Sequence, residues 1–503
     1  MERDLDLLVI GGGINGAGIA RDAAGRGLAV ALVEAGDFGG GIPGASSKLI
    51  DCSLRHLGLR RLGRVRKALA EREILLDIAP HISRPQAFVF PHVPGRRPDW
   101  LLRAGLILYD HLARRDAIPG STRVDLRQDR AGRALQPRYG TAVRYWDSWV
   151  DDDRLVVANV RDAADRGASI HPRSRAVAAD WDGTRWRVML DHGRALVARQ
   201  IVNATGPWVQ TVARTVLKLG DAPALRLVQS SHIVTRRINL GNDAFVLQQP
   251  DGRIVFVIPY EQDFTLIGTT EHGVDDAVAT PITAPITADE RRYLLDAANR
   301  YLVRALTERD IVHSHAAVHS LLLESGKGGR ETSRNDRIME HDGVPALSVV
   351  GGRIATYRVL AEAVMAKVAP KSKRWTATAP LPGGGVERLA GENGQAAFAR
   401  WLKHLTEVHE NYDPKLINRL ARSIGIATES LLARGLGRNL GGVFEAELAY
   451  YAADEWATTA DDVLWRRTKL GLHLDAAAKA RVAAWFGDNV PAGTPASRFV
   501  EPA

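Results

Sequence analysis

Apolar and small residues recur along the chain in one arrangement: a short apolar run, a turn of small residues, and then a helical periodicity. The first example is an apolar run over Leu5–Ile10, followed by glycines and a predicted helix over Ala17–Arg26. A second run, within 198–209, ends in Ala-Thr-Gly, and a third, within 346–364, crosses a Gly-Gly pair into an amphipathic helix. Each segment predicts a buried strand that opens into a loop of small residues.

The glycines of the first segment have the spacing of a dinucleotide-binding turn. Gly11, Gly13 and Gly16 form G-x-G-x-x-G, which allows a tight turn, a close approach of backbone to a diphosphate, and close packing of helix on strand. A second predicted strand, Ala29–Val33, ends at Glu34, a carboxylate suited to a ribose 2′-hydroxyl and repelled by a 2′-phosphate. The pattern therefore predicts a dinucleotide other than NADP, with its phosphates at the helix N-terminus.

The two later segments favour a flavin. Three strand-to-loop junctions are expected to meet one ligand, because each has the same order of strand, small residues and break or helix. The helix after the Gly-Gly pair offers a second N-terminus, whose dipole suits the negative charge that a reduced flavin carries around N1 and O2. We therefore predict FAD rather than NAD.

Composition narrows the setting. The chain has 503 residues, of which 45% are hydrophobic and 25% charged, so two or three domains with packed cores are expected. The single cysteine, Cys52, excludes an internal disulfide framework and favours a cytoplasmic location. Neither a secretory leader nor a run of about 20 apolar residues is found, so any membrane contact is expected to be peripheral. The net charge of +9 favours anionic partners.

The order of the segments predicts an α/β fold: a Rossmann-like FAD-binding domain interleaved with a mixed-sheet substrate domain, plus a helical C-terminal domain. A hairpin within 251–270 is expected in the substrate sheet, a linker over Ala369–Glu387, and a loose tail from Asp488. The predicted boundaries are 1–372 for the oxidoreductase region (FAD-binding segments about 1–70, 150–215 and 335–370; substrate domain about 75–150 and 216–334) and 373–503 for the helical domain.

Longer motifs carry a resemblance to a known family. They are ASSKLI (45–50), LAEREILLDIAPH (69–81), YDHLARR (109–115), WVDDDRLVVANVRDAADRGA (149–168), NATGPWV, SSHIV, GRIVFVIPYEQDFTLIGTTE (252–271), GGRIATYRVLAE, LPGG (381–384) and ELAYYAADEWATTADDVLWRRTKLGLHL (447–474). In this order, and together with the opening glycine segment, they resemble the aerobic, FAD-dependent glycerol-3-phosphate dehydrogenases over nearly the whole chain.

The resemblance implies a reaction and a site. Members of the family bind FAD, oxidise glycerol 3-phosphate to dihydroxyacetone phosphate by passing the C2 hydride to the flavin, and deliver the electrons to membrane quinone. Substrate contacts are implied at Arg55, His232, Thr270 and Arg334, with His232 as proton acceptor because imidazole titrates near the working pH. The FAD contacts expected from the loops and the resemblance together are Gly11, Gly13, Ile14, Asn15, Gly16, Glu34, Ser46, Ser47, Lys48, Thr205, Gly206, Gly351, Gly352, Arg353 and Thr356.

The chain departs from the family at the site rather than in the scaffold. Residues 42–44 read IPG where relatives read TSS, and residues 51–56 read DCSLRH where relatives read HGGLRY. His319 replaces a catalytic-region arginine, Arg353 a lysine and Ala355 a threonine, so His319 and Arg353 are also catalytic candidates. Losing a bidentate arginine weakens anion binding. Two interpretations stay open: a dehydrogenase for glycerol 3-phosphate or another polyol phosphate, and an FAD-binding protein with impaired catalysis.

Remaining signals concern metals, membranes and partners. His313, His315 and His319 suggest a metal site, but their segment aligns with a substrate loop, so no metal is expected. A basic run over 60–67 and an apolar helix with basic ends over 96–115 suit the inner face of the cytoplasmic membrane, or equally a core helix under a basic rim. No recognition motif supports nucleic acid as a partner. A homodimer stays open.

Overall fold

The computed structural model describes residues 4–50, 62–93, 105, 109–112, 115–238, 241–274, 285–326, 329–333 and 336–490. The chain forms two compact units, each made of segments that are distant in the sequence. Unit 1 contains 1–44, 151–227 and 319–503, and unit 2 contains 45–150 and 228–318. The interleaving expected from the sequence is therefore present, and the helical C-terminal region belongs to the same unit as the glycine segment.

A mostly parallel sheet forms the centre of unit 1. In spatial order its strands are β18 (Arg337–Glu340), β19 (Ala346–Val350), β10 (Ala195–Asn203), β1 (Leu5–Ile10), β2 (Val30–Val33) and β7 (Ser169–His171), with β9 (Trp186–Leu190) paired to β10 and β8 (Ala176–Trp181) to β9. The four strands β19, β10, β1 and β2 run parallel. They are short apolar runs, as expected for parallel strands that are covered on both faces.

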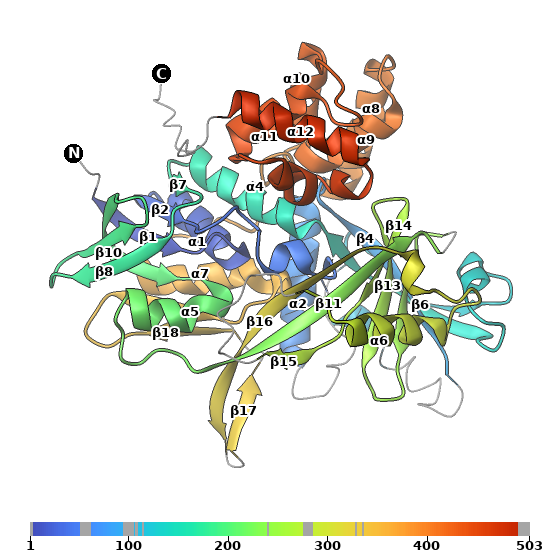
Figure 1. Ribbon diagram of the computed structural model, residues 1–503, viewed down its shortest axis with the longest axis horizontal. Helices are drawn as coiled ribbons and strands as arrows, with labels where there is room; N and C mark the ends of the chain where they lie inside the picture. The colour runs from blue at the N-terminus through green and yellow to red at the C-terminus, as the bar shows by residue number, and fades with distance from the viewer. Residues whose placement is uncertain are drawn as a thin grey trace. The chain divides into compact units, whose positions relative to one another are not determined.

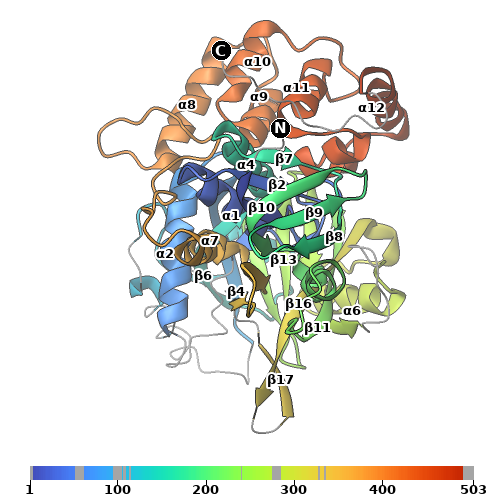
Figure 2. The same ribbon diagram turned by 90° about the vertical axis from the view of Figure 1, so that its left-hand side faces the viewer.

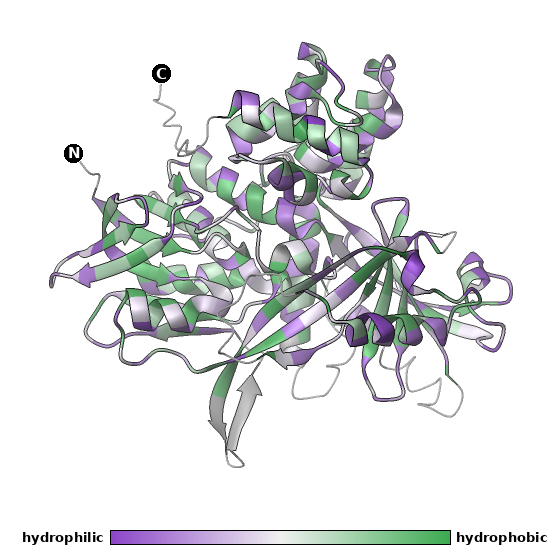
Figure 3. Ribbon diagram, viewed as in Figure 1, coloured by the Kyte–Doolittle hydropathy of each residue, from purple (hydrophilic) through white to green (hydrophobic). Residues whose placement is uncertain are grey.

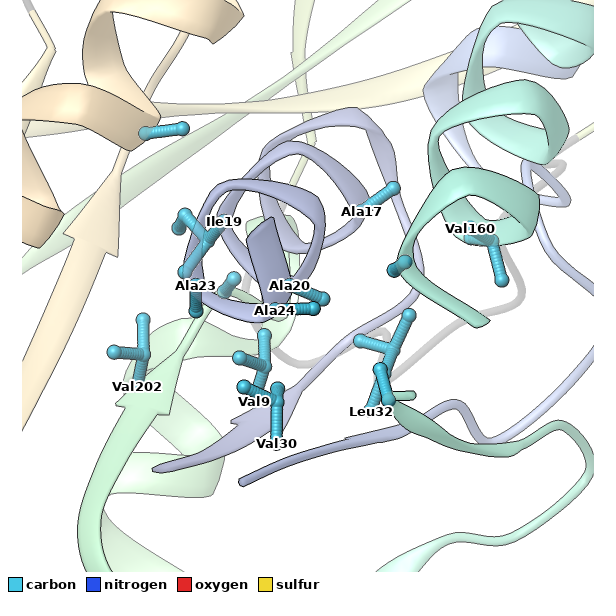
Figure 4. Packing of buried hydrophobic residues seen from close by; sticks show 14 of the residues in the cluster. Val9, Ala17, Ile19, Ala20, Ala23, Ala24, Val30, Leu32, Val160 and Val202 are labelled. Atoms are coloured by element: carbon cyan, nitrogen blue, oxygen red, sulfur yellow. The ribbon is translucent and has the colours of Figure 1, made fainter. Parts of the chain in front are cut away.

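Three helices pack on one face of this sheet. They are α1 (Ile14–Gly25), α4 (Asp152–Asp165) and α7 (Tyr357–Val368). Figure 4 shows α1 lying over the strands, with Ala20, Ala23 and Ala24 on the side that faces Val9, Val30 and Leu32. The small alanine side chains allow helix and sheet to approach closely. α1 begins earlier than predicted, directly after the glycine turn, whereas the first strand matches its prediction.

Unit 2 is built on a second, mixed sheet. Its strands lie in the order β17 (Gly329–Ser333), β16 (Ile311–Gly326), β11 (Leu225–Arg236), β14 (Phe264–Gly268), β13 (Ile254–Tyr260), β12 (Ala244–Gln248), β4 (Ser83–Pro91), β6 (Thr141–Val150) and β3 (Leu49–Ile50), with β15 (His272–Val274) on β11 and β5 (Thr122–Asp125) on β6. β16 and β11 each contain a boundary between the units, and β17 belongs to unit 1. β13 and β14 form the predicted hairpin. The helices of unit 2 are α2 (Leu62–Ile78) and α6 (Ala288–Asn299).

The C-terminal region is helical, as predicted. Its helices are α8 (Gly394–Val408), α9 (Pro414–Ile424), α10 (Ala427–Arg434), α11 (Glu445–Glu455) and α12 (Ala476–Asn489), with a short helical turn, η9 (Asp462–Arg467), before α12. Figures 1 and 2 show these helices, in orange to red, beside α4. Figure 3 shows them with mixed hydropathy, typical of amphipathic helices, whereas several strands of each sheet have long hydrophobic stretches, in green.

The predicted linker is irregular but packs on α1. Trp375 Nε1 donates a hydrogen bond to the carbonyl oxygen of Asp22, and Arg21 Nη2 donates one to the carbonyl oxygen of Ala379. The indole fills the space that Gly25 leaves by lacking a side chain. The chain is therefore fixed to α1 before the C-terminal helices begin. Across the described residues, no helix combines the length and the apolarity needed to cross a membrane.

Candidate functional site

The three strand ends singled out in the sequence meet at one edge of the unit 1 sheet. β1, β10 and β19 are neighbours and run parallel, so their C-terminal ends lie together. The backbone N–H of Ala204, just past β10, donates to the carbonyl oxygen of Ile10 at 2.8 Å. The prediction that these junctions face a common region is confirmed. In open α/β sheets this edge is where ligands bind.

Glycines shape the turn after β1 in two different ways. Gly11 has a φ of +109°, and a Cβ there would lie 2.6 Å from the carbonyl oxygen of Ala204. A Cβ on Gly16 would overlap the carbonyl oxygen of Gly11. Gly13, in contrast, faces open space, with nothing within 4 Å of its ideal Cβ position. Backbone packing therefore requires glycine at positions 11 and 16, whereas Gly13 leaves room beside the helix N-terminus.

Two helices of this edge begin without a side-chain cap. α1 starts after Gly13 and α7 after Thr356, and neither N-cap residue accepts a side-chain hydrogen bond from the first turn. Neither first turn contains an acidic residue. Helix N-termini of this kind suit an anion, because the helix dipole favours negative charge there.

Glu34 ties the glycine turn to the loop after β2. Its Oε2 accepts the backbone N–H of Gly12 at 2.6 Å, and its Oε1 accepts that of Gly36 at 2.7 Å. Burial raises the pKa of Glu34, although these two hydrogen bonds oppose the change. Each carboxylate oxygen keeps a further lone pair, which suits the ribose hydroxyl that the sequence assigns to it.

Asn15 joins the first and third loops. Its Nδ2 donates to the carbonyl oxygen of Gly351 at 3.0 Å. Gly352 has a φ of +104°, and a Cβ there would overlap the Asn15 amide. The Oδ1 of Asn15 is buried and accepts no hydrogen bond from the described residues. An unsatisfied buried acceptor is costly, so this atom fits a ligand that carries hydroxyl or amide donors, as FAD does.

The remaining cofactor candidates of unit 1 have separate roles. Thr205 Oγ1 donates to Asn203 Oδ1 at 2.7 Å, and Thr356 Oγ1 donates to Asp336 Oδ2 at 3.2 Å, so both hydroxyls order the loops. Gly206, with a φ of +59°, has open space at its Cβ position. Arg353 is exposed at the N-terminus of the turn before α7.

Ser46, Ser47 and Lys48 lie in unit 2, before β3. Ser46 Oγ accepts the backbone N–H of Lys48 at 2.9 Å, and the carbonyl oxygen of Lys48 accepts the N–H of Val150. Lys48 has a φ of +59° and is 1% exposed, while both serines are half-buried. The segment is thus a tight bend that buries an ammonium group.

His232 is buried in the unit 2 sheet. It lies on β11 and is 2% exposed, and its ring stacks on that of His315 of β16 with 5.2 Å between centroids. Gly268 is its cross-strand neighbour on β14, and a Cβ there would overlap the His232 ring. The absence of a side chain at Gly268 is therefore what makes room for the imidazole. His313 and His315 share a strand face, as predicted, with ring centroids 5.9 Å apart.

Glu290, which is not among the site residues predicted from the sequence, accepts hydrogen bonds from hydroxyl groups next to His232. Ser231 and Thr270 donate their hydroxyls to its Oε1 at 2.6 and 3.0 Å, and Thr287 caps the start of α6 through its Oε2. Burial alone would raise the pKa of Glu290, but these hydrogen bonds outweigh it and the pKa is lowered. The sequence T-A-D-E is a capping box, the one signal available. The Thr270 hydroxyl thus binds Glu290.

The remaining sequence predictions concern Arg55, Arg334, Cys52, the basic segments, His319 and a metal site. Arg55, Arg334 and Cys52 lie outside the described residues, as do residues 60–61 of the basic run and most of the segment over 96–115. His319 is half-buried on β16. Within the described chain, one acidic group could suit a metal ion, Asp151 to Asp153, but the ammonium of Lys469 pairs with Asp153 and lies 3.7 Å from Asp151. A lysine therefore neutralises this cluster.

The chain is similar in sequence to known flavin-dependent oxidoreductases. The model of the family described as FAD dependent oxidoreductase matches residues 6–344. The chain is 41% identical to the D-erythritol 1-phosphate dehydrogenase of Brucella abortus (strain 2308) and 40% identical to the aerobic glycerol-3-phosphate dehydrogenase of Escherichia coli (strain K12), in each case over 96% of this chain and 97% of the relative.

A solved structure shares the fold. The glycerol-3-phosphate dehydrogenase of Bacillus halodurans, complexed with FAD, superposes with a TM-score of 0.76 and 26% sequence identity, over 97% of this chain and 91% of that one. The glycine turn, the uncapped helices and the orphan acceptor of Asn15 suit the same cofactor. The chain therefore belongs to the FAD-dependent glycerol-3-phosphate dehydrogenase family, and its cofactor is FAD.

Proposed function

We propose that this chain oxidises a short phosphorylated polyol, glycerol 3-phosphate or a longer homologue such as erythritol 1-phosphate, to the corresponding keto phosphate. The observation that carries the proposal is the near-equal, full-length similarity to dehydrogenases of both substrates, combined with a retained nucleotide site in unit 1. FAD supplies the chemistry by accepting the hydride that leaves the alcohol carbon. The reaction class depends on holding this cofactor, and the open space at Gly13, beside the N-terminus of α1, supports that.

His232 is the proposed proton acceptor for the alcohol being oxidised. It is the residue that the family resemblance assigns, and the protein reserves a buried place for its ring by having glycine at position 268. Ser231, next to His232 on β11, and Thr270, just past β14, both donate their hydroxyls to Glu290. Arg55 and Arg334 are the proposed clamp for the phosphate group, because guanidinium groups bind phosphate with two parallel hydrogen bonds.

The proposed electron acceptor is a quinone reached from the cytoplasmic face of the membrane, as the resemblance implies. Reoxidation of the reduced enzyme tests this proposal directly. A soluble ubiquinone analogue should reoxidise the flavin at least tenfold faster than dissolved oxygen does. Equal rates, or reoxidation by oxygen alone, would favour an oxidase instead.

The substitutions at His319 and Arg353 favour a changed substrate preference. Where the resemblance places a permanently charged, bidentate arginine, this chain has the smaller His319, and we expect this change to weaken one anion contact and to accommodate a longer polyol chain. The same substitutions favour the second candidate, an FAD-binding protein with impaired catalysis, because a lost charged hydrogen bond costs about 1.5–3 kcal/mol.

Anaerobic flavin reduction separates these functions. Purified yellow protein is mixed with glycerol 3-phosphate, with D-erythritol 1-phosphate, and with unphosphorylated erythritol, and the flavin absorbance is followed. Rapid bleaching by a phosphorylated polyol supports the proposal, and the relative rates identify the preferred chain length. The variant His319→Arg should shift the preference toward glycerol 3-phosphate. Persistent colour with every polyol phosphate would leave the impaired protein as the correct interpretation.

A further inference from the structure

The loop that follows Glu34 is fixed by residues of the helical C-terminal region. Asp37, whose side chain is 3% exposed, accepts two parallel hydrogen bonds from Arg467, each 2.7 Å long, across 430 positions of sequence. Arg466 pairs with the same carboxylate. Both arginines belong to η9. The short loop that carries Glu34 at its start is thus bound at its middle by the far end of the chain.

Arg467 is itself held inside a chain of ion pairs. Its side chain is fully buried and also donates to the carbonyl oxygen of Glu455 at the end of α11. The Glu455 carboxylate in turn binds both Nη atoms of Arg154 from α4. Buried ion pairs add little net stability, because removing the charges from water costs about as much as the attraction returns. These ion pairs do fix the relative positions of their side chains, since a planar guanidinium that donates two parallel hydrogen bonds holds its carboxylate partner in one orientation.

An aromatic contact connects the same two regions. Trp456, which follows α11, meets Phe38 edge to face with ring centroids 5.7 Å apart. Phe38 is fully buried, and its ring lies where a side chain on Gly12 would be, since a Cβ there would come within 2.5 Å of Phe38 Cδ1. Gly12 donates its N–H to Glu34. The Trp456 indole therefore supports the backbone of the dinucleotide turn through the ring of Phe38.

A third contact holds the end of the loop. Gly39 packs on Asp153 of α4, with 3.4 Å between its ideal Cβ position and Oδ1. Lys469, in the C-terminal region, pairs with the carboxylate of Asp153. The loop from Glu34 to Gly39 is thus held at Asp37, at Phe38 and, through Asp153, at Gly39, each time with a C-terminal residue as the final support.

We infer that the helical C-terminal region is part of the FAD site: Arg467 and Trp456 act as positioning residues that hold the hydrogen bond between Gly12 and Glu34. Neither residue needs to touch the cofactor. Without them the loop after β2 loses its fixed position, and the carboxylate no longer meets the adenosine ribose in a single geometry. Preorganised contacts bind more tightly than contacts that must be ordered on binding.

Arg419 provides a matched control. It also makes a two-pronged pair with a fully buried carboxylate, that of Glu447, with distances of 2.6 and 2.8 Å. Both partners lie within the C-terminal helices, and neither Arg419 nor Glu447 has a hydrogen bond or ion pair with the loop after β2 among the described contacts. Replacing Arg419 therefore breaks a two-pronged ion pair of the C-terminal region and leaves the pair between Arg467 and Asp37 in place.

The test compares Arg467→Met with Arg419→Met in the full chain. FAD is removed, and its rebinding is followed by the quenching of flavin fluorescence well below the unfolding temperature of each apoprotein. We expect the dissociation constant for FAD to rise at least tenfold in Arg467→Met and less than twofold in Arg419→Met. ADP, which has the ribose and diphosphate but no flavin, should lose affinity by the same factor.

Two further variants cover the case in which Arg467→Met does not fold. Asp37→Asn removes the charge that Arg467 binds while keeping the side-chain shape, and Trp456→Leu removes the aromatic support. Each of these two variants should raise the dissociation constant for FAD severalfold. As a rescue, Arg467→Lys should restore part of the FAD affinity that is lost in Arg467→Met. Unchanged affinity for FAD and ADP in every folded variant of Asp37, Trp456 and Arg467 would overturn the inference. So would equal losses in the Arg419 control.

Discussion

The nucleotide turn of unit 1 and the buried histidine of unit 2 both depend on glycines, but for opposite reasons. At Gly11 and Gly16 the missing side chain lets backbone pack on backbone. At Gly268 it lets a ring from another strand occupy the space. The first arrangement follows from local spacing, because strand, turn and helix are consecutive. The second depends on which strands become neighbours, and that information is spread over the chain.

Breaking the backbone arrangement should have the largest effect. Gly16→Ala places a Cβ on the carbonyl oxygen of Gly11, which neither strand nor helix can relieve without moving apart. We expect FAD binding to be lost together with most of the folded protein. The measurement is the yield of yellow, monodisperse protein, with the thermal unfolding of whatever apoprotein remains.

Gly13→Ala is the matched control for this substitution. Gly13 has a φ of −77°, which any residue adopts, and its Cβ position is open. The apoprotein should therefore unfold within about 1 °C of the native one, while the dissociation constant for FAD rises at least tenfold, because the methyl group takes the place of the diphosphate. Equal damage from both substitutions would contradict the distinction between the two glycines.

At the second region the effect should fall on the rate rather than on the fold. His232→Asn removes the proposed proton acceptor, and general-base catalysis contributes typically 10²–10⁴-fold, so anaerobic flavin reduction should slow by about that factor with FAD still bound. Gly268→Ala leaves the imidazole in the chain but pushes it aside, and should slow the same step. Normal reduction by Gly268→Ala would show that the ring position is not critical.

The sequence predicted most of what local order determines. The strand over Leu5–Ile10, the three meeting junctions, the hairpin of β13 and β14, and the helical C-terminal region are all confirmed. Each rests on neighbouring residues: apolar runs, turns of small residues, or helical periodicity. The start of α1 was predicted too late, because the glycines at its N-terminus have low helix propensity and conceal the first turn.

What the sequence did not predict are contacts between distant segments. Glu290 is recognisable as the end of a capping box, but nothing local indicates that it also binds Ser231 and Thr270. Asp37 and Arg467 look like ordinary charged residues until the fold buries them as a pair. Such pairings follow from tertiary packing, and a single sequence contains no periodicity that reports them.

Glu290 tests whether a hydroxyl network supports the histidine. Glu290→Gln keeps the size but puts an NH2 group at one of the two oxygen positions, so either the Ser231 and Thr270 hydroxyls at Oε1 or the Thr287 N–H at Oε2 lose their acceptor. We expect flavin reduction to slow about tenfold and stability to fall by about 1–3 kcal/mol, the usual cost of leaving a buried polar group unpaired. Stopped-flow reduction and urea unfolding measure the two effects. Lost stability with an unchanged rate would restrict Glu290 to a structural role.

The smallest expected effect is a difference between the two regions in the pH at which each begins to lose stability. His171 lies on β7, where its carbonyl oxygen accepts the N–H of Glu34, and burial, aided by Arg194 and His192, lowers its pKa to about 4. Between its unfolded pKa of about 6.5 and this value, the unfolded chain binds the extra proton. Unit 1 therefore loses stability as the pH falls below 6.5. In unit 2 the pKa of Glu290 is lowered, so the stability that its ionised carboxylate contributes is lost only below about pH 4.5.

His171→Asn should remove the first of these losses. Between pH 7 and pH 5 the native protein is expected to lose about 1–2 kcal/mol more stability than the variant, since each unit of pKa difference corresponds to about 1.4 kcal/mol. Urea unfolding at both pH values measures the difference, and carboxylate effects cancel because both proteins share them. The exposed His404 of α8 supplies the control. If His404→Asn flattened the pH dependence as much as His171→Asn, burial on β7 would not be the cause, and the early acid sensitivity would no longer distinguish the nucleotide region from the histidine region.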